Sequence, residues 1–462
     1  MKKMISFLLT LLMVATMFTA CAKTEPSDQT TDPAPTTDTA STTETTPADA
    51  SASDTATGEA TTLRIAMWGD EARAAAFQET LAPWAEANNV TIQIELAALS
   101  EYYDKLSAQL GAGTAPDVFW IADAREGTFI SSGWCENLRS TLEADPEWNI
   151  GDFYDGVLEA TDYVGDGGIY GVPLSFGVRA IFWNKTLFEA AGVKTPQECW
   201  DDGTWTYETM FDLASQINAY DSSKIGSKMW TVNQSGNGVQ TWADMLLAYG
   251  ANIVNDDSTE FTLDSAEGYK VTQMVYDAMF VNNAHAKPGD ETAFVSGNVA
   301  MSRETYSYMK NMVNGEVDFE WDLVPLPYGD AGKDANLYTG YAFWCANAYG
   351  EHKDLAADLI RFVTMPDTQL EWCKTFMTPR KSVMNSDEIL NPGEGYPSAE
   401  HIKAAFVDSI EERPLARYTG TTEWTLFCTT VQQYYEMIWA GAYNVEDGIA
   451  AMKEECEQYL NH

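Results

Sequence analysis

The histidines and cysteines of this 462-residue chain are too scattered to predict a familiar catalytic or metal centre. The four histidines, His285, His352, His401 and His462, lie far apart, and no cysteine pair has the CxxC spacing of a zinc site. The sequence contains no HExxH, no GxSxG, no Walker loop and no GxGxxG that opens a helix after a strand. We therefore expect no catalytic residue, no metal and no cofactor.

Paired carboxylates are the one catalytic arrangement that stays open. Glycoside hydrolysis needs only two carboxyl groups, about 5 to 9.5 Å apart, and the chain has 69 acidic residues. No spacing singles out such a pair, so a secreted glycoside hydrolase is the alternative function. The formal net charge of −42 argues against nucleic acid and anionic lipid as partners, because the surface repels both.

Aromatic side chains are the other abundant group with binding chemistry. The chain has 15 Trp, 22 Tyr and 19 Phe residues, more than a core of this size requires. We expect some of them to line a surface, where flat rings can cover an apolar ligand face. Composition alone does not say which ones.

The elements that must position such residues alternate between strands and helices. Hydrophobic patterns predict strands at 63–68, 90–96 and 118–121, with amphipathic helices at 77–84 and 103–110 between them. This succession is typical of a doubly wound α/β sheet, whose binding groups lie at the carboxyl ends of its strands. Ser100 is a plausible helix cap, and Asp264 with Glu267 predicts a capping box before a later helix.

Two strand ends carry residues suited to such an edge. Trp68 ends the first predicted strand, and Asp123 follows the third. Core packing is the alternative for Trp68, and a helix cap is the alternative for Asp123. Arg125 either reaches a ligand or pairs with Glu126.

The amino terminus predicts export. Lys2 and Lys3 precede an apolar run at 5–18 that is too short to span a bilayer, so residues 1–20 are predicted to be a signal peptide. The small residues before Cys21 resemble the lipobox of bacterial lipoproteins, although ordinary secretion fits the same segment. Residues 22–60 contain no Ile, Leu, Val, Met or aromatic residue, which predicts a disordered tether on the extracytoplasmic face of the membrane.

Six cysteines follow Cys21 and are widely spaced. They are Cys135, Cys199, Cys345, Cys373, Cys428 and Cys456. Disulfides and buried free thiols fit them equally well, and no pairing is preferred. Residues 61–462 exceed what one hydrophobic core usually serves, so we expect two lobes.

Short motifs along the chain resemble one protein family. They are YDKL at 103–106, GTAPD at 113–117, IYGVP at 169–173, WNKTLF at 183–188, TWTYE at 204–208, FVSGNVAM at 294–301, LVPLP at 323–327 and TPR at 378–380. Their types and order resemble the extracellular solute-binding proteins of family 1, which contain the maltose-binding protein. An insert at 197–203 departs from the family pattern, so the resemblance does not give its local structure.

The resemblance implies a type II periplasmic-binding-protein-like fold, with two α/β lobes joined by a three-stranded hinge around a ligand cleft. One lobe would take 61–178 plus 324–366, and the other 179–323 plus 367–462. The implied function is capture of a sugar or oligosaccharide and delivery to the permease of an ATP-binding-cassette importer, as a monomer without enzyme activity. A carbohydrate-binding adhesin lipoprotein is a further alternative.

A sugar has apolar faces and hydroxyl edges, so its site needs aromatic planes with polar groups beside them. The strand-end rule and the resemblance together give the candidate contacts. These are Trp68, Asp70, Asp123, Arg125, Ser175, Phe176, Arg179, Asn237, Gln240, Trp242, Tyr306, Tyr341, Phe343, Trp344, Arg380 and Trp424. Hinge packing is the alternative for the candidates at 175–179, and alternate residues of 341–344 must point into the core.

Overall fold

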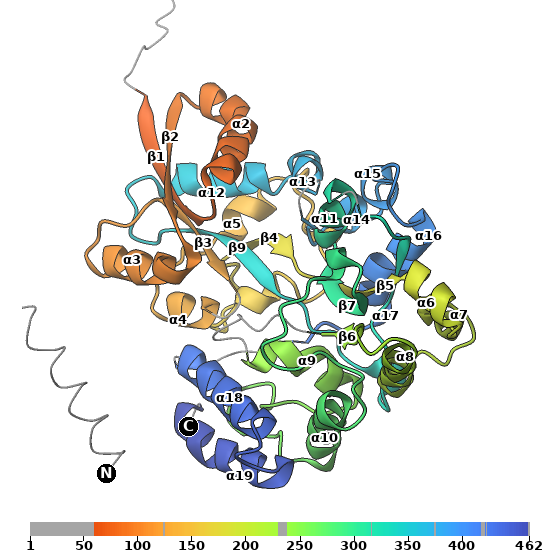
Figure 1. The fold of residues 1–462 in the computed structure, drawn as a ribbon. Coiled ribbons are helices and arrows are strands. Elements are labelled where there is room, and N and C mark those ends of the chain that lie inside the picture. The colour runs from red at the N-terminus through yellow and green to blue at the C-terminus, as the bar shows by residue number, and fades with distance from the viewer. Residues whose placement is uncertain are drawn as a thin grey trace, which may run out of the picture. The chain divides into compact units, whose positions relative to one another are not determined.

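The computed structural model describes residues 60–122, 125–229, 238–315, 317–373, 376–416, 421 and 423–460, without the side chains of residues 238–241 and 372. Residues 59–462 fall in one unit. Among the described residues, two β-sheets carry helices on their faces (Figure 1). The α/β fold class predicted from the sequence is therefore confirmed.

The first sheet has the strand order β2-β1-β3-β9-β4. Its strands are β1 (Thr61–Trp68), β2 (Val90–Ala97), β3 (Val118–Ala122), β4 (Val172–Phe176) and β9 (Tyr341–Ala346). β1 pairs in parallel with β2 and β3, whereas β9 runs antiparallel to β3 and β4. The three strands predicted first along the chain are confirmed, as are the helices between them, α2 (Glu71–Ala87) and α3 (Leu99–Gly111).

The two faces of this sheet are covered by different helices. The apolar run of β3 is buried on both faces, as expected for a strand inside a mainly parallel sheet. On one face Trp120 belongs to a cluster with Phe77 of α2, and on the other Phe119 belongs to a cluster with Tyr102 of α3. Helix α12 (Lys353–Val363) also packs on β9 and joins α2 through a 2.8 Å bond from Trp84 Nε1 to Asp358.

The second sheet has the order β6-β7-β5-β8. Its strands are β5 (Arg179–Asn184), β6 (Ile225–Lys228), β7 (Val299–Thr305) and β8 (Trp321–Val324). β6 and β7 are parallel, and β5 runs antiparallel to β7 and β8. Helix α8 (Tyr207–Tyr220) packs on β6 and β7, while α10 (Ala266–Phe280) contacts α9 (Gly238–Ala248).

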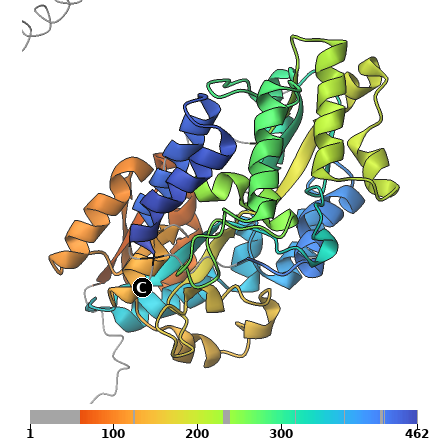
Figure 2. The same ribbon diagram turned by 90° about the horizontal axis from the view of Figure 1, so that it is seen from below.

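The remaining helices connect and surround these layers. They are α4 (Glu126–Ser131), α5 (Arg139–Glu143), α6 (Lys185–Ala191), α7 (Pro196–Asp201), α11 (Tyr308–Asn314), α13 (Pro366–Trp372), α14 (Lys381–Met384), α15 (Asp387–Leu390), α16 (Ala399–Ile402), α17 (Ser409–Glu412), α18 (Trp424–Trp439) and α19 (Val445–Cys456). Helices α18 and α19 pack on each other, and α18 also contacts α9; they are the dark blue pair in Figure 2. No helix in the described part of the chain is both long and apolar enough to cross a bilayer.

Local capping differs in part from the sequence predictions. α3 begins at Leu99 without a side-chain cap, so the cap predicted at Ser100 was wrong. Ser265 caps α10, because its hydroxyl accepts from Gly268, while Asp264 pairs at 2.7 Å with Lys453. The insert at 197–203 begins with most of α7, which a reciprocal capping box between Thr195 and Glu198 starts.

A histidine ion pair ties α16 to the second sheet. His401 Nδ1 lies 2.9 Å from Asp322 of β8. This hydrogen bond to Asp322 is the largest cause that raises the pKa of His401, with smaller contributions from the charges of Asp322, Glu400 and Asp201. Because the folded pKa is raised, the stabilisation is complete below the ordinary histidine pKa and is lost as the pH rises through the folded value.

We predict that His401→Gln lowers the free energy of unfolding by about 0.5 to 1 kcal/mol at about pH 5.5 and by much less at about pH 9. Urea unfolding of both proteins at the two pH values measures the difference. His352→Gln serves as the control, since it leaves Asp322 unchanged. An equal loss at both pH values would show that the ion pair contributes nothing.

Candidate ligand-binding site

One edge of the first sheet collects the carboxyl ends of four strands. The register pairs Trp68 with Ala97 at the ends of β1 and β2, and Ala122 of β3 with Ala342. Phe176, at the end of β4, pairs with Tyr341, the first residue of β9. The residues at this edge are thus the ones at which parallel α/β sheets bind their ligands.

The second sheet presents a matching edge. Arg179 begins β5 and pairs with Thr305 at the end of β7, and Ile181 pairs with Val324 at the end of β8. Only residues 177 and 178 separate the end of β4 from the start of β5. The two edges are therefore joined by a very short crossover.

Three chain segments lie side by side at this junction. The Gly177 amide donates to Gly340 at 2.8 Å, and the Phe176 amide donates to Met377 at 2.9 Å. A Cβ atom on Gly177 would stand 3.2 Å from the Gly340 oxygen, so the absence of a side chain permits this close approach. Three segments meet here, the same number as the strands that the family resemblance implied for a hinge, but Gly177, Gly340 and Met377 lie outside the strands.

Trp68 has the geometry expected of a stacking residue. It is half-buried, and its ring packs edge-on against Tyr102 at 5.3 Å and Trp120 at 5.2 Å between centroids. Arg125 is also half-buried, and its guanidinium lies 5.1 Å from the ring centre of Tyr103, not in an ion pair with Glu126. An aromatic surface with a cation at its margin therefore lies at the ends of β1 and β3.

Tyr341 extends this aromatic surface along the edge. Its ring is half-buried, stacks on Phe343 at 5.5 Å and lies 5.6 Å from Phe176. Phe176 is itself buried and stacks on Tyr154 at 6.1 Å. Ser175 is half-buried next to a bulge in the pairing of β4 with β9. Tyr341 therefore offers more surface to a ligand than Phe176 does.

The guanidinium group of Arg179 does not have all of its hydrogen bonds filled. Its guanidinium lies 5.3 Å from the ring centre of Tyr338, but its buried Nη1 atom has no hydrogen-bond partner. The hydroxyl of Thr339, on the adjacent crossover segment, also lacks a partner. Buried polar atoms without partners are rare and destabilising in proteins, so these groups are suited to a polar ligand.

Sequence reasoning missed a buried ion pair near the same junction. Arg303 of β7 and Asp244 of α9 lie 3.0 Å apart, with side chains 6% and 1% exposed. Burial is the largest effect on Arg303 and lowers its pKa, while the charge of Asp244 opposes that shift. The other carboxylate oxygen of Asp244 has no partner. These two residues are 59 positions apart, and no motif links them.

His285 has a structural position that its isolation in the sequence did not suggest. Its Nε2 accepts a 2.9 Å hydrogen bond from the Met229 amide, directly after β6, and its Nδ1 lies 2.7 Å from the Ala286 carbonyl. Burial lowers the pKa of His285 to about 4, so the ring is neutral at ordinary pH. The histidine therefore fixes the backbone at the end of β6.

Several aromatic candidates lie in the core instead of at the surface. Trp242, Tyr306, Phe343, Trp344 and Trp424 are all buried, with exposed fractions of 7% or less. Tyr306 donates to the Ile389 carbonyl at 3.0 Å, Trp344 packs on Trp120, and Trp424 stacks on Phe427. Because these side chains are buried, we leave them out of the proposed site.

Two polar candidates have structural roles. Asp70 caps α2 by accepting a 2.8 Å bond from the Arg73 amide. Arg380 is fully buried, pairs with Asp152 at 3.2 Å, donates to Thr364, and lies over the rings of Phe153 and Trp148. Burial is the main reason that the pKa of Arg380 falls to about 10. Arg380 has no exposed surface, although its Nη2 atom has no hydrogen-bond partner, and we leave it out of the proposed site. Asp123, Asn237, the side chain of Gln240, and Cys21 lie outside the described residues.

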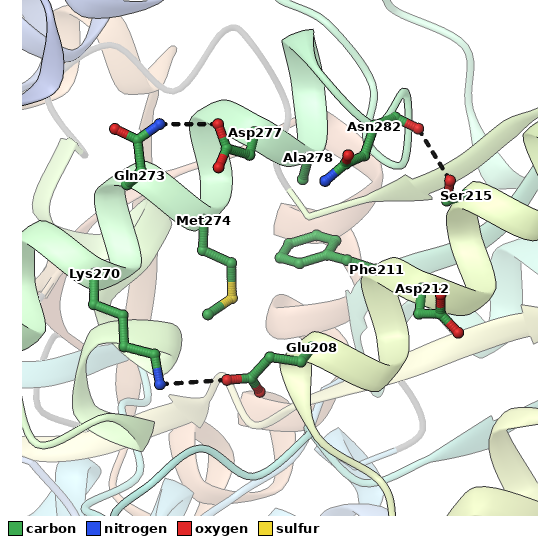
Figure 3. Close-up of a pocket in the computed structure, with 10 residues that line it drawn as sticks. All are labelled: Glu208, Phe211, Asp212, Ser215, Lys270, Gln273, Met274, Asp277, Ala278 and Asn282. Atoms are coloured by element: carbon green, nitrogen blue, oxygen red, sulfur yellow. Dashed lines mark hydrogen bonds and ion pairs between the residues drawn. The ribbon is translucent and has the colours of Figure 1, made fainter.

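A separate pocket lies between α8 and α10 (Figure 3). It has a volume of about 530 Å³, and Phe211 and Met274 point into it from the two helices. Lys270 and Glu208 form a 3.4 Å ion pair across it. Because helices build this pocket, it is distinct from the strand-edge site. In the described part of the chain, no group of three or more His, Cys, Asp or Glu residues is arranged to hold a metal ion.

The fold is that of type II periplasmic-binding proteins. A solute-binding protein from Thermotoga lettingae, solved with alpha-D-tagatose, superposes with a TM-score of 0.70 at 18% identity, covering 87% of this chain and 100% of that one. The fold predicted from the resemblance is confirmed by this likeness together with the two sheets.

The sequence assigns the family. Residues 72–394 match the model of the bacterial extracellular solute-binding proteins, and the chain belongs to that family. A protein of Brucella abortus named as a binding protein is 27% identical over 259 residues, which span 54% of this chain and 58% of that relative. The erythritol/L-threitol-binding protein of Mycolicibacterium smegmatis is 24% identical over 311 residues, 62% of this chain and 63% of that relative.

We predict effects of different size on stability from removing two arginines of the second sheet. Arg303→Met lowers the free energy of unfolding by about 3 to 5 kcal/mol, because Asp244 is left charged in a buried place. Arg179→Met changes it by less than about 1 kcal/mol, since no described carboxylate pairs with Arg179 and none is left buried without its partner. Urea denaturation measures both, and a larger loss for the Arg179 variant would contradict the assignment.

Arg380 gives a second stability prediction. Arg380→Met leaves Asp152 buried without its partner and lowers the free energy of unfolding by about 3 to 5 kcal/mol. The matched control is Lys381→Met, because Lys381 pairs with an exposed Asp155 and such pairs contribute about 0 to 1 kcal/mol. Equal losses in thermal or urea unfolding would rule out a special role for Arg380.

Proposed function

We propose that this protein captures a sugar or an oligosaccharide at the strand-edge site and delivers it to the permease of an ATP-binding-cassette importer. One observation carries the proposal. Half-buried aromatic rings lie at the carboxyl edge of the first sheet, and polar groups without partners lie beside the two-residue crossover that leads from this edge to the second sheet. Flat apolar rings beside unused hydrogen-bonding groups match the chemistry of a polyhydroxylated ring.

The aromatic rings would cover the apolar faces of the sugar. Trp68 and Tyr341 are half-buried, so each keeps exposed ring surface at the edge. Arg179 and Arg125 would bind hydroxyl oxygens with their guanidinium groups. The names of the relatives support this ligand class, since one binds a four-carbon polyol and one solved structure holds a hexose.

The site would close by rotation of two lobes. The proposed lobes are residues 61–178 plus 324–366 and residues 179–323 plus 367–462. Sheet membership supports this division for the strands, because β5 to β8 lie in one sheet and β1 to β4 with β9 lie in the other; only Val324, the last residue of β8, falls on the other side of the proposed boundary. A ligand that contacts both lobes would favour the closed form, and its differential affinity is the only energy for that shift.

The location and partners follow the same proposal. A signal peptide at 1–20 would direct export, lipid on Cys21 would anchor the chain, and residues 22–60 would act as the tether. The protein would act as a monomer on the extracytoplasmic face and present its closed form to the permease. The matched relatives are binding proteins, which supports release of the ligand without chemical change.

We predict that a sugar raises the thermal unfolding midpoint of the exported domain. Erythritol, D-tagatose, arabinotriose and maltotetraose are suitable probes, and one present at about 100 times its Kd adds about 2.7 kcal/mol of stability. Trp68→Ala weakens that sugar by about tenfold or less, the contribution of one aromatic contact. Differential scanning fluorimetry and isothermal calorimetry measure the two effects.

Trp134→Ala is the matched control, because Trp134 is also half-buried but precedes Cys135, which bridges Asn347 beyond the far end of β9. Its affinity should equal that of the unchanged protein. Chromatography of the sugar after a day of incubation tests for turnover. Released product would favour the glycoside hydrolase, and no shift with any carbohydrate would overturn the proposal.

A further inference from the structure

The first sheet opens between β1 and β3. These two strands pair only at Ile65 with Val118 and at Ala66 with Phe119. Beyond that point β1 stays paired with β2 as far as Trp68, and β3 stays paired with β9 as far as Ala122. The strands therefore separate just before the ligand edge, at the place where the strand order reverses, which is where open α/β sheets form a crevice.

The hydroxyl of Tyr102 occupies this gap. It accepts a 3.0 Å hydrogen bond from the Trp120 amide and lies 3.1 Å from the Ala66 carbonyl and 2.9 Å from the Trp120 carbonyl. One phenol group thus bonds to the backbone of both strands where their own ladder has ended. The side chain is 2% exposed, so these backbone groups have no ready replacement from solvent.

Burial raises the pKa of Tyr102 well above its usual value. The group therefore stays protonated and keeps both its donor and its acceptor function at any ordinary pH.

Trp68 lies over the opening that Tyr102 spans. Its ring contacts Tyr102, which belongs to the cluster on one face of the sheet, and Trp120, which belongs to the cluster on the other face. The interplanar angles are 76° and 80°, so both contacts are edge-to-face. The orientation of the Trp68 ring therefore depends on its contacts with Tyr102 and Trp120, one on each face of the sheet.

We infer that Tyr102 is a positioning residue for ligand binding: its hydroxyl holds β1 and β3 apart and thereby sets the orientation of Trp68 toward the sugar. The inference rests on the proposed function, in which Trp68 stacks on the ligand. A purely structural Tyr102 would stabilise the sheet without controlling the orientation of Trp68.

The test compares Tyr102→Phe with Thr161→Val. Thr161 is a fair match because its buried hydroxyl also bridges two backbone groups, accepting from Tyr170 at 3.2 Å and donating to Leu158 at 3.0 Å. Both variants lose one hydroxyl and keep the shape of the side chain. The domain is labelled with 5-fluorotryptophan, and Trp68→Phe identifies the Trp68 resonance.

We expect Tyr102→Phe to shift or broaden the Trp68 fluorine resonance in the ligand-free protein, and Thr161→Val to leave it in place. Titration with D-tagatose and maltotetraose should give about fivefold weaker binding for Tyr102→Phe, within the range of one aromatic contact. The loss of affinity should vanish in a Trp68→Ala background, because Tyr102 then has no Trp68 ring to orient toward the ligand.

An unchanged Trp68 resonance in Tyr102→Phe would overturn the inference, as would an equal loss of affinity with and without Trp68. Failure of both sugars to bind the unchanged protein would count against the proposed function and leave the resonance shift to decide the role of Tyr102. If Tyr102→Phe does not fold, amide exchange at Trp120 in the unchanged protein decides instead, since fast exchange would exclude the bond to Tyr102.

Discussion

The short crossover between the two sheets is the constraint on which the rest of the structure depends. Phe176 is the last residue of β4 in the first sheet, and Arg179 is the first residue of β5 in the second. The ligand-side edges of the two sheets therefore lie next to each other. Backbone hydrogen bonds from Phe176 to Met377 and from Gly177 to Gly340 bring two distant segments to the same place. These bonds hold the three segments side by side at the proposed hinge. The proposed ligand edge and the proposed hinge therefore lie in one region of the molecule.

Charged groups around this region fall into two kinds. Arg380 is enclosed by Asp152, backbone carbonyls and aromatic rings, and its role is to hold the third segment in place. Each of the two arginines has one buried nitrogen atom without a hydrogen-bond partner, but Arg179 lies over the ring of Tyr338 and forms no ion pair with a described residue. The ion pair with Asp152 makes Arg380 part of the fold, whereas Arg179, without such a pair, is the arginine that we propose for ligand binding. Residue type alone does not separate these two arginines.

The sequence predicted β1, β2 and β3 of the first sheet and the two helices between them because their periodicity is local. It predicted Trp68 at a strand end for the same reason, and the structure has that ring half-buried at the ligand edge. Phe343 and Trp344 were harder to judge. They lie in a strand that is covered on both faces, so the usual alternation of buried and exposed side chains does not apply to them.

The sequence by itself determined the family, the alternation of strands and helices, and the chemical types available for binding, since these depend on short spacings and on the order of motifs. Only the tertiary structure decided which aromatic rings keep an exposed face and that Arg303 meets Asp244. It also decided that Tyr102 reaches into the gap between β1 and β3. The physical reason is distance along the chain. Such contacts form only when crossovers bring separate segments together, and no local sequence pattern predicts which residues then touch.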